Sequence, residues 1–91
     1  MNHSMLIQNF LFKNGYKNYD IVLCSCVHSS NTIFMLAEDF ANECLKMNGE
    51  GWITAQRVNV EYLLETLEHD SDELELLEVV YRRSRAMRNF H

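Results

Sequence analysis

One segment of the chain, residues 19–28, is apolar on both faces of the strand it would form. Its alternate positions carry Ile21, Leu23 and Val27 on one face and Val22, Cys24 and Cys26 on the other. A strand with two apolar faces needs cover on both sides or a central place in a sheet. A second run of β-branched and apolar residues, 32–36, follows the polar Ser29-Ser30-Asn31. We therefore predict a β-hairpin.

Helical periodicity flanks the hairpin on both sides. Residues 4–14 predict a helix with Ser4 as its N-cap and Gly15 as its stop, and the competing prediction is a strand over 5–12. Residues 37–48 predict a helix that ends at Asn48-Gly49. Residues 51–58 alternate imperfectly and predict a third strand.

The last third of the chain predicts helices only. Asn59 can cap one helix, and Asp70 with Glu73 has the spacing of a capping box for another; the alternative is one long helix broken at 69–71. The 91 residues suffice for one hydrophobic core, and no flexible linker divides them. We expect a single α+β domain, residues 1–91, in which a small antiparallel sheet packs with helices and the chain ends in a helical pair.

Composition and charge argue against several classes of protein. The net charge of −5 disfavours general binding to nucleic acid or anionic membranes. The longest uncharged stretch, residues 21–37, is too short and too polar at its middle to span a bilayer, and the N-terminus lacks the basic opening of a signal peptide. Three cysteines, two of them only two residues apart, predict free thiols in a reducing cytoplasm.

Cys24, Cys26 and His28 are the residues whose types and spacing best suit metal binding or catalysis. On a strand they would share one face, and thiolates and imidazole bind zinc well. A structural zinc site needs four ligands, so we favour buried cysteines that act as small apolar side chains; a thiol nucleophile is the other alternative. The chain has no phosphate-binding glycine loop and no common hydrolase motif. We predict a non-enzymatic protein without metal or cofactor.

Acidic residues concentrate between positions 61 and 78, a segment without lysine or arginine. The candidate partner-binding residues among them are Glu65, Glu68, Asp72 and Glu75. A dense negative surface can imitate a phosphate backbone and occupy a basic groove on a nucleic-acid-binding protein. Such acids are more often the solvated faces of amphipathic helices, and the interleaved leucines favour that interpretation.

The charge reverses near the C-terminus, where Arg82, Arg85 and Arg88 follow Tyr81. Such a cluster can grip phosphates or a carboxylate-rich partner. Cations also suit the last turns of a helix, and we favour that explanation while keeping the three arginines as candidates. Trp52, next to Gly51 in a predicted edge strand, is our candidate for an exposed aromatic anchor.

Our leading hypothesis is a small protein that binds another protein and modulates or inhibits it. Compact acidic chains without catalytic motifs fit inhibitors encoded by phages or other mobile elements, including inhibitors of host nucleases and other defence proteins, such as anti-CRISPR proteins. The alternative is a nucleic-acid-binding regulator that uses the arginine cluster, whose affinity would fall steeply with salt. The sequence is equally compatible with a monomer and with a homodimer that pairs through the N-terminal or the C-terminal helix.

Overall fold

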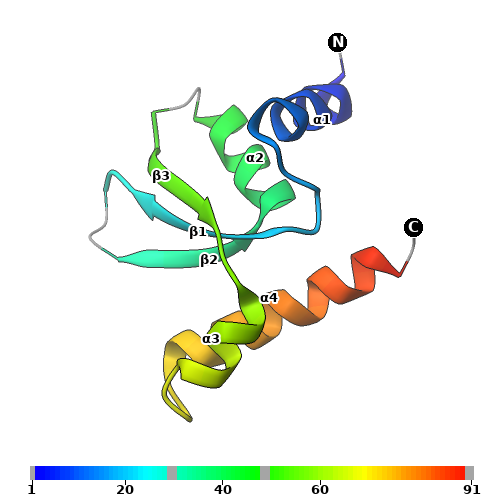
Figure 1. Cartoon of the computed structure of the whole chain (residues 1–91). Coiled ribbons are helices and arrows are strands. Elements are labelled where there is room, and N and C mark those ends of the chain that lie inside the picture. Colours follow the sequence, from blue (N-terminus) through cyan, green and yellow to red (C-terminus); the bar gives the residue numbers. More distant parts are fainter. Residues whose placement is uncertain (1, 29–30, 48–49, 90–91) are drawn as a thin grey trace.

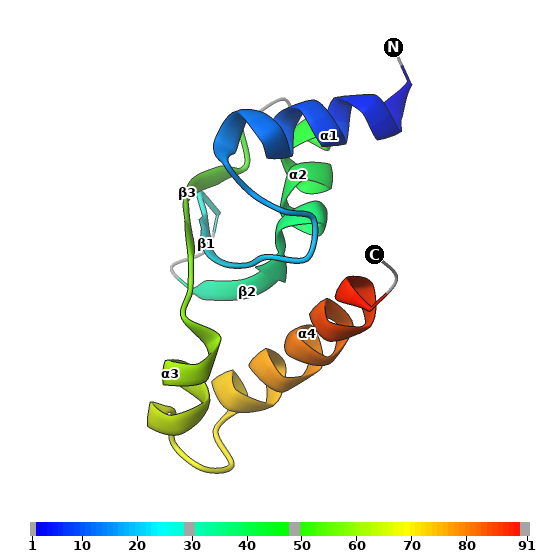
Figure 2. The same ribbon diagram turned by 45° about the vertical axis from the view of Figure 1, so that its right-hand side comes forward.

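The computed structural model describes residues 2–28, 31–47 and 50–89. These residues form an α+β fold in three layers (Figure 1). The elements are α1 (His3–Asn14), β1 (Ile21–Cys26), β2 (Thr32–Leu36), α2 (Ala37–Lys46), β3 (Trp52–Arg57), α3 (Val60–Thr66) and α4 (Asp72–Arg88). The sheet lies between α1 and α2 on one side and α3 and α4 on the other (Figure 2).

The three strands form an antiparallel sheet in the order β2-β1-β3. The predicted hairpin is confirmed, with Ile21 opposite Leu36 and Leu23 opposite Phe34; Ser29 and Ser30 of the predicted turn lie outside the described residues. The third predicted strand pairs with the other edge of β1. β1 is therefore central, as its two apolar faces require.

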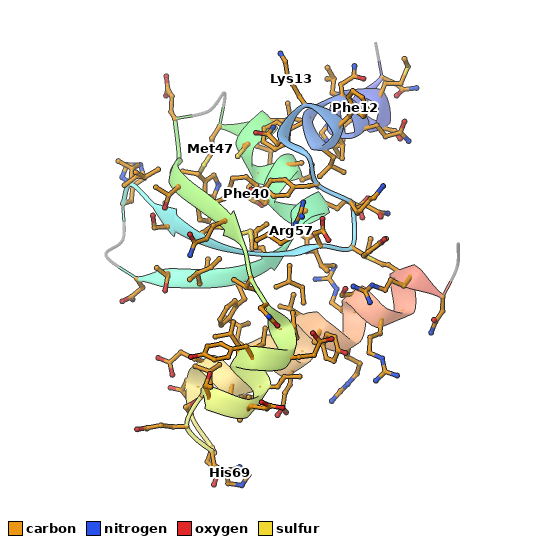
Figure 3. The ribbon with its side chains drawn as sticks, viewed as in Figure 1. Phe12, Lys13, Phe40, Met47, Arg57 and His69 are labelled. Atoms are coloured by element: carbon orange, nitrogen blue, oxygen red, sulfur yellow. The ribbon has the colours of Figure 1, made fainter. Side chains whose placement is uncertain are left out.

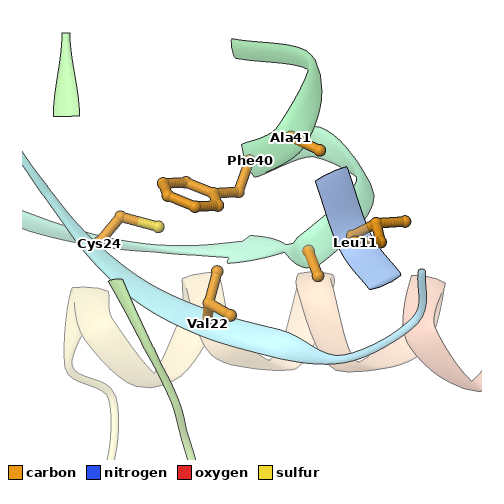
Figure 4. Close-up of a cluster of buried hydrophobic side chains, with 6 residues drawn as sticks. Leu11, Val22, Cys24, Phe40 and Ala41 are labelled. Atoms are coloured by element: carbon orange, nitrogen blue, oxygen red, sulfur yellow. The ribbon is translucent and has the colours of Figure 1, made fainter. Parts of the chain in front are cut away.

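One hydrophobic core lies between the sheet and the pair α1–α2. Val22 and Cys24 are fully buried on this face of β1, beneath Phe40 of α2 and near Leu11 of α1 (Figure 4). The Phe40 ring meets the Phe10 and Trp52 rings edge-on, at 5.9 and 6.0 Å between centroids. These contacts hold both helices against β1 and β3.

A second core, where the length of the chain predicted only one, lies on the opposite face of the sheet, against α4. Ile21, Phe34 and Leu36 pack there with Leu77 and Val80. Ile21 and its neighbour Val22 belong to opposite cores because successive side chains of a strand point to opposite faces. The buried Ser84 of α4 also donates a hydrogen bond of 2.6 Å to the Tyr19 carbonyl oxygen, which fastens the helix to the segment before β1.

The helix ends agree only in part with the predicted caps and stops. α1 is the helix that the sequence favours over a strand, and it does stop at Gly15, but its N-cap is Asn2 and not Ser4: the Asn2 side chain accepts from the Met5 backbone N–H at 2.8 Å. The α2 stop predicted at Asn48-Gly49 lies outside the described residues. The cap predicted at Asn59 is confirmed by a 3.1 Å bond from the Tyr62 N–H.

The C-terminal third is a helical pair and not one continuous helix. Asp70 does not cap α4, because its backbone adopts the left-handed conformation with φ 65°. Ser71 is the N-cap instead, and its hydroxyl oxygen accepts from the Leu74 N–H at 3.2 Å. The break predicted at residues 69–71 is thus correct, while the capping residue is its neighbour.

Candidate functional site

The predicted acidic residues gather at one end of the molecule. Glu65 lies on α3, Glu68 in the following turn, and Asp72 and Glu75 at the start of α4, and all four are exposed. His69 marks the tip of this turn (Figure 3). We call residues 61–78 the acidic end; its eight carboxylates, Glu61, Glu65, Glu68, Asp70, Asp72, Glu73, Glu75 and Glu78, are all exposed.

Local helix physics explains only part of this charge. Asp72, Glu73 and Glu75 lie in the first turn of α4, where the helix dipole favours carboxylates. Glu61 has the same reason in the first turn of α3, whereas Glu65 lies near the C-terminal end of α3, where the dipole does not favour a carboxylate. Within the described residues, no carboxylate of the acidic end makes an ion pair with lysine or arginine. In the described part of the chain, the negative charge of this surface is therefore not neutralised by lysine or arginine side chains.

The predicted arginines lie on the second half of α4 and are exposed, yet two of them also serve packing within the chain. The Arg88 guanidinium lies 4.9 Å from the centre of the Tyr19 ring, and that of Arg85 lies 5.8 Å from the centre of the Tyr81 ring. Their neighbour Arg83 pairs with Asp39 of α2 at 3.0 Å. Arg82 makes no ion pair in the described part of the chain, so it is the arginine most available to a ligand.

Trp52 lies on the inner face of β3, opposite Cys26, and packs against Phe40 in the first core. Its indole N–H is buried without a hydrogen-bond partner in the described structure. The residue is only partly accessible, so most of its ring area serves the core. Its place beside Gly51 in the sequence suggested exposure, whereas its register on β3 turns the ring inward.

The structure does not place Cys24, Cys26 and His28 on one strand face. β1 ends at Cys26, after a register shift between Ser25 and Cys26, and His28 is exposed beyond the strand end. Burial, with a smaller contribution from the Cys44 thiol, raises the pKa of Cys24 to about 12. Among the described residues, no three histidine, cysteine or acidic side chains are grouped to hold a metal ion.

A groove that sequence reasoning missed opens beside the acidic end. It has a volume of about 440 Å³ and lies between the sheet and the α3–α4 pair. Its apolar lining includes Leu23, Phe34, Tyr62, Leu63, Leu67 and Leu76. Each of these residues fits the periodicity of its own strand or helix, and only the packing of the elements reveals the space between them. A partial signal was available in Tyr62, a large aromatic residue directly following Glu61 in the most acidic segment.

A polar cluster around Arg57 joins β3 to the segment between α1 and β1. The Arg57 side chain donates to the Gly15 carbonyl oxygen, lies 3.4 Å from a carboxylate oxygen of Asp20, and stacks over the Tyr16 ring at 5.7 Å. Asp20 also accepts from the Lys17 backbone N–H at 2.8 Å. Because its guanidinium has three internal contacts, we assign Arg57 a structural role.

The outer side of α1 carries exposed apolar residues. Phe12 is 89% exposed and points away from the sheet (Figure 3), and Met5 is 49% exposed one heptad earlier. This face suits the pairing of helices that the sequence suggests, and the homodimer stays a prediction.

Comparison with models of protein families, with curated proteins and with solved structures found no significant match to this chain. Among the described residues, none of the helices combines the length and the apolar character that crossing a membrane requires.

Proposed function

We propose that this chain is a non-enzymatic binding protein of the cytoplasm that modulates or inhibits a partner protein, and that the partner is itself a basic nucleic-acid-binding protein or complex. The observation that carries the proposal is the acidic end, where eight exposed carboxylates occur without a lysine or arginine partner among residues 2–28, 31–47 and 50–89. A compact negative surface is complementary to a groove built for phosphate, and it speeds association with such a groove at low salt. A phage or mobile-element inhibitor of a host defence protein, such as an anti-CRISPR protein, is the form of this function that we would test first.

The distribution of charge supports a protein partner over nucleic acid. Eight of the chain's 13 acidic residues lie in the acidic end, which holds none of its eight lysines and arginines. A phosphate backbone would be repelled from this end, whereas a basic protein surface would be attracted to it. Arg82, the most available arginine of α4, could still contact acidic residues at the margin of the same partner.

The test is capture from a lysate with the tagged protein, with half of each sample treated with nuclease. We expect a stoichiometric protein partner that resists nuclease and is lost with Glu65→Lys/Glu75→Lys. The matched control is Glu43→Lys/Glu50→Lys, which changes the net charge equally but lies outside the acidic end, and it should retain the partner. Capture that is unaffected by Glu65→Lys/Glu75→Lys would exclude the acidic end as the binding surface.

The alternative function, a nucleic-acid-binding regulator, has one observation in its favour: Arg82 is exposed and without an ion pair in the described structure. It predicts that only nucleic acid is captured, that nuclease removes it, and that Arg82→Glu/Arg85→Glu/Arg88→Glu abolishes it. That combined result would replace our proposal with the alternative.

A further inference from the structure

The groove beside the acidic end exists because α4 covers only part of one sheet face. Leu77 and Val80 close over Ile21 and Leu36 at one end of the strands. Toward the other end, α3 and the start of α4 stand away from the sheet, and the space between them is the groove of about 440 Å³. This volume is of the size that proteins use to enclose one or two large apolar side chains or a small ligand.

The floor and the mouth of the groove are apolar. Phe34 from β2 and Leu63 and Leu67 from the α3 region line its interior. Tyr62 and Leu76 are also part of the lining and remain 61% and 36% exposed. An aromatic and an aliphatic side chain on opposite helices, both accessible to solvent, offer contact area to an incoming apolar group.

Carboxylates lie in and next to this apolar mouth on the helical side. Glu73 lines the groove itself, Asp72 precedes Leu76 by one helical turn, and Glu65 follows Tyr62 by about one turn. Among the described residues, Arg57 is the one cation in the lining, and its guanidinium is engaged by Asp20, Tyr16 and the Gly15 carbonyl group. A ligand in the groove therefore meets an apolar interior and a negative rim.

We propose that the groove binds a basic amphipathic segment of the partner protein, whose apolar side chains enter between Tyr62 and Leu76 while flanking lysines or arginines contact the rim. This inference rests on the proposed function and specifies where and how the partner docks. Apolar contact supplies affinity, and the rim selects basic over acidic segments. An amphipathic helix is the element that most simply presents apolar anchors together with flanking cations, since its apolar residues repeat on one face.

The direct test uses defined synthetic peptides. The probe is an amphipathic helix of roughly 16 residues with two leucines one turn apart and lysines on both sides. One twin has glutamate in place of every lysine, and a second has alanine in place of both leucines. Methyl and amide NMR shifts of the full chain should change around Leu63, Leu67 and Leu76 with the first peptide, and both twins should bind at least about tenfold more weakly.

Two variants of the protein, both on α4, provide the matched comparison. Leu76→Arg places a cation in the mouth of the groove and should weaken binding of the lysine peptide by about tenfold or more. Val79→Arg adds the same charge at a position that is 49% exposed and outside the groove lining, and it should change the affinity by less than about twofold. Equal effects of the two variants, or equal binding of the lysine and glutamate peptides, would overturn the inference.

The outcomes also separate this inference from the proposed function. If Leu76→Arg still captures the nuclease-resistant partner while Glu65→Lys/Glu75→Lys loses it, the groove inference fails and the function stands. If no protein partner is captured, the function fails whatever the peptides do. Binding of an apolar dye such as anilinonaphthalene sulfonate without any selective binding of the lysine peptide would indicate a small-molecule groove and overturn the inference.

Discussion

At the residue scale, Gly15 shows a backbone requirement that no contact reveals. It ends α1 with φ 76°, and its N–H bonds to the Leu11 and Phe12 carbonyl oxygens. An added Cβ would meet no atom within 4 Å, so the cost of Gly15→Ala comes from the left-handed backbone alone. We expect a loss of about 1 kcal/mol in urea unfolding. Gly15→Asn should lose less because asparagine tolerates this conformation, and an alanine variant as stable as the parent would contradict the argument.

The raised pKa of Cys24 predicts a loss of stability in alkali. Below pH 9 the thiol is protonated in both states; between its unfolded pKa of 9.0 and its folded pKa of about 12, only the unfolded chain releases the proton. The free energy of unfolding should therefore fall with rising pH in this interval, by at most about 1.4 kcal/mol per pH unit from this group. Urea unfolding of the parent and of Cys24→Ala should diverge above about pH 9. Parallel pH profiles would show that the thiol is not held protonated by the fold.

At the element scale, the α3–α4 turn shows how far sequence reasoning reaches. The break at residues 69–71 was predictable because serine and aspartate gather there between two apolar periodicities. Which of them caps α4 was not, because serine and aspartate can both accept the bond and the choice depends on the backbone of the turn. Asp70 takes the left-handed conformation, which leaves Ser71 extended and in place to cap. The same ambiguity explains Asn2 in place of Ser4 at α1.

The two residues of this turn should respond oppositely to substitution. Ser71→Ala removes the acceptor for the Leu74 N–H and should cost about 1 kcal/mol of unfolding free energy. Asp70→Gly should cost nothing or stabilise slightly, because glycine adopts φ 65° without steric strain. Thermal and urea unfolding monitored by circular dichroism measures both. If Asp70→Gly were the more costly change, Asp70 would have a capping role that the geometry does not indicate.

At the scale of the whole molecule, the acidic end and the groove differ in how they are encoded. The acidic end is a property of one segment, so counting charges from 61 to 78 located its candidate residues. The groove has walls from all three strands and the α3–α4 pair, and depends on how far α4 extends over the sheet. Periodicity assigns Phe34, Leu63 and Leu67 to the core of the fold, which is correct for each residue but says nothing of the space they enclose. The exposure expected for Trp52 differs from its partial burial for the same reason, since the orientation of the ring follows from strand register, and its role as an anchor stays a prediction.

At the same scale, the two cores should be coupled through β1. Ile21 and Val22 place adjacent backbone units of one strand in opposite cores, so loss of one core should release the other. Leu77→Ala removes a fully buried side chain from the α4 core and should cost about 2–5 kcal/mol. The lone tryptophan, Trp52, reports on the opposite core by fluorescence.

In urea, the fluorescence midpoint of Leu77→Ala should therefore fall as far as the midpoint measured by circular dichroism, although Trp52 and Leu77 lie on opposite sides of the sheet. Leu76→Ala is the control on the same helix, and it should cost much less because Leu76 is already 36% exposed. If α4 unfolded while Trp52 fluorescence stayed native, the α3–α4 layer would unfold independently of the sheet and the α1–α2 layer. In that case β1 would not couple the two faces of the fold, and a partner bound at the acidic end would stabilise only that layer.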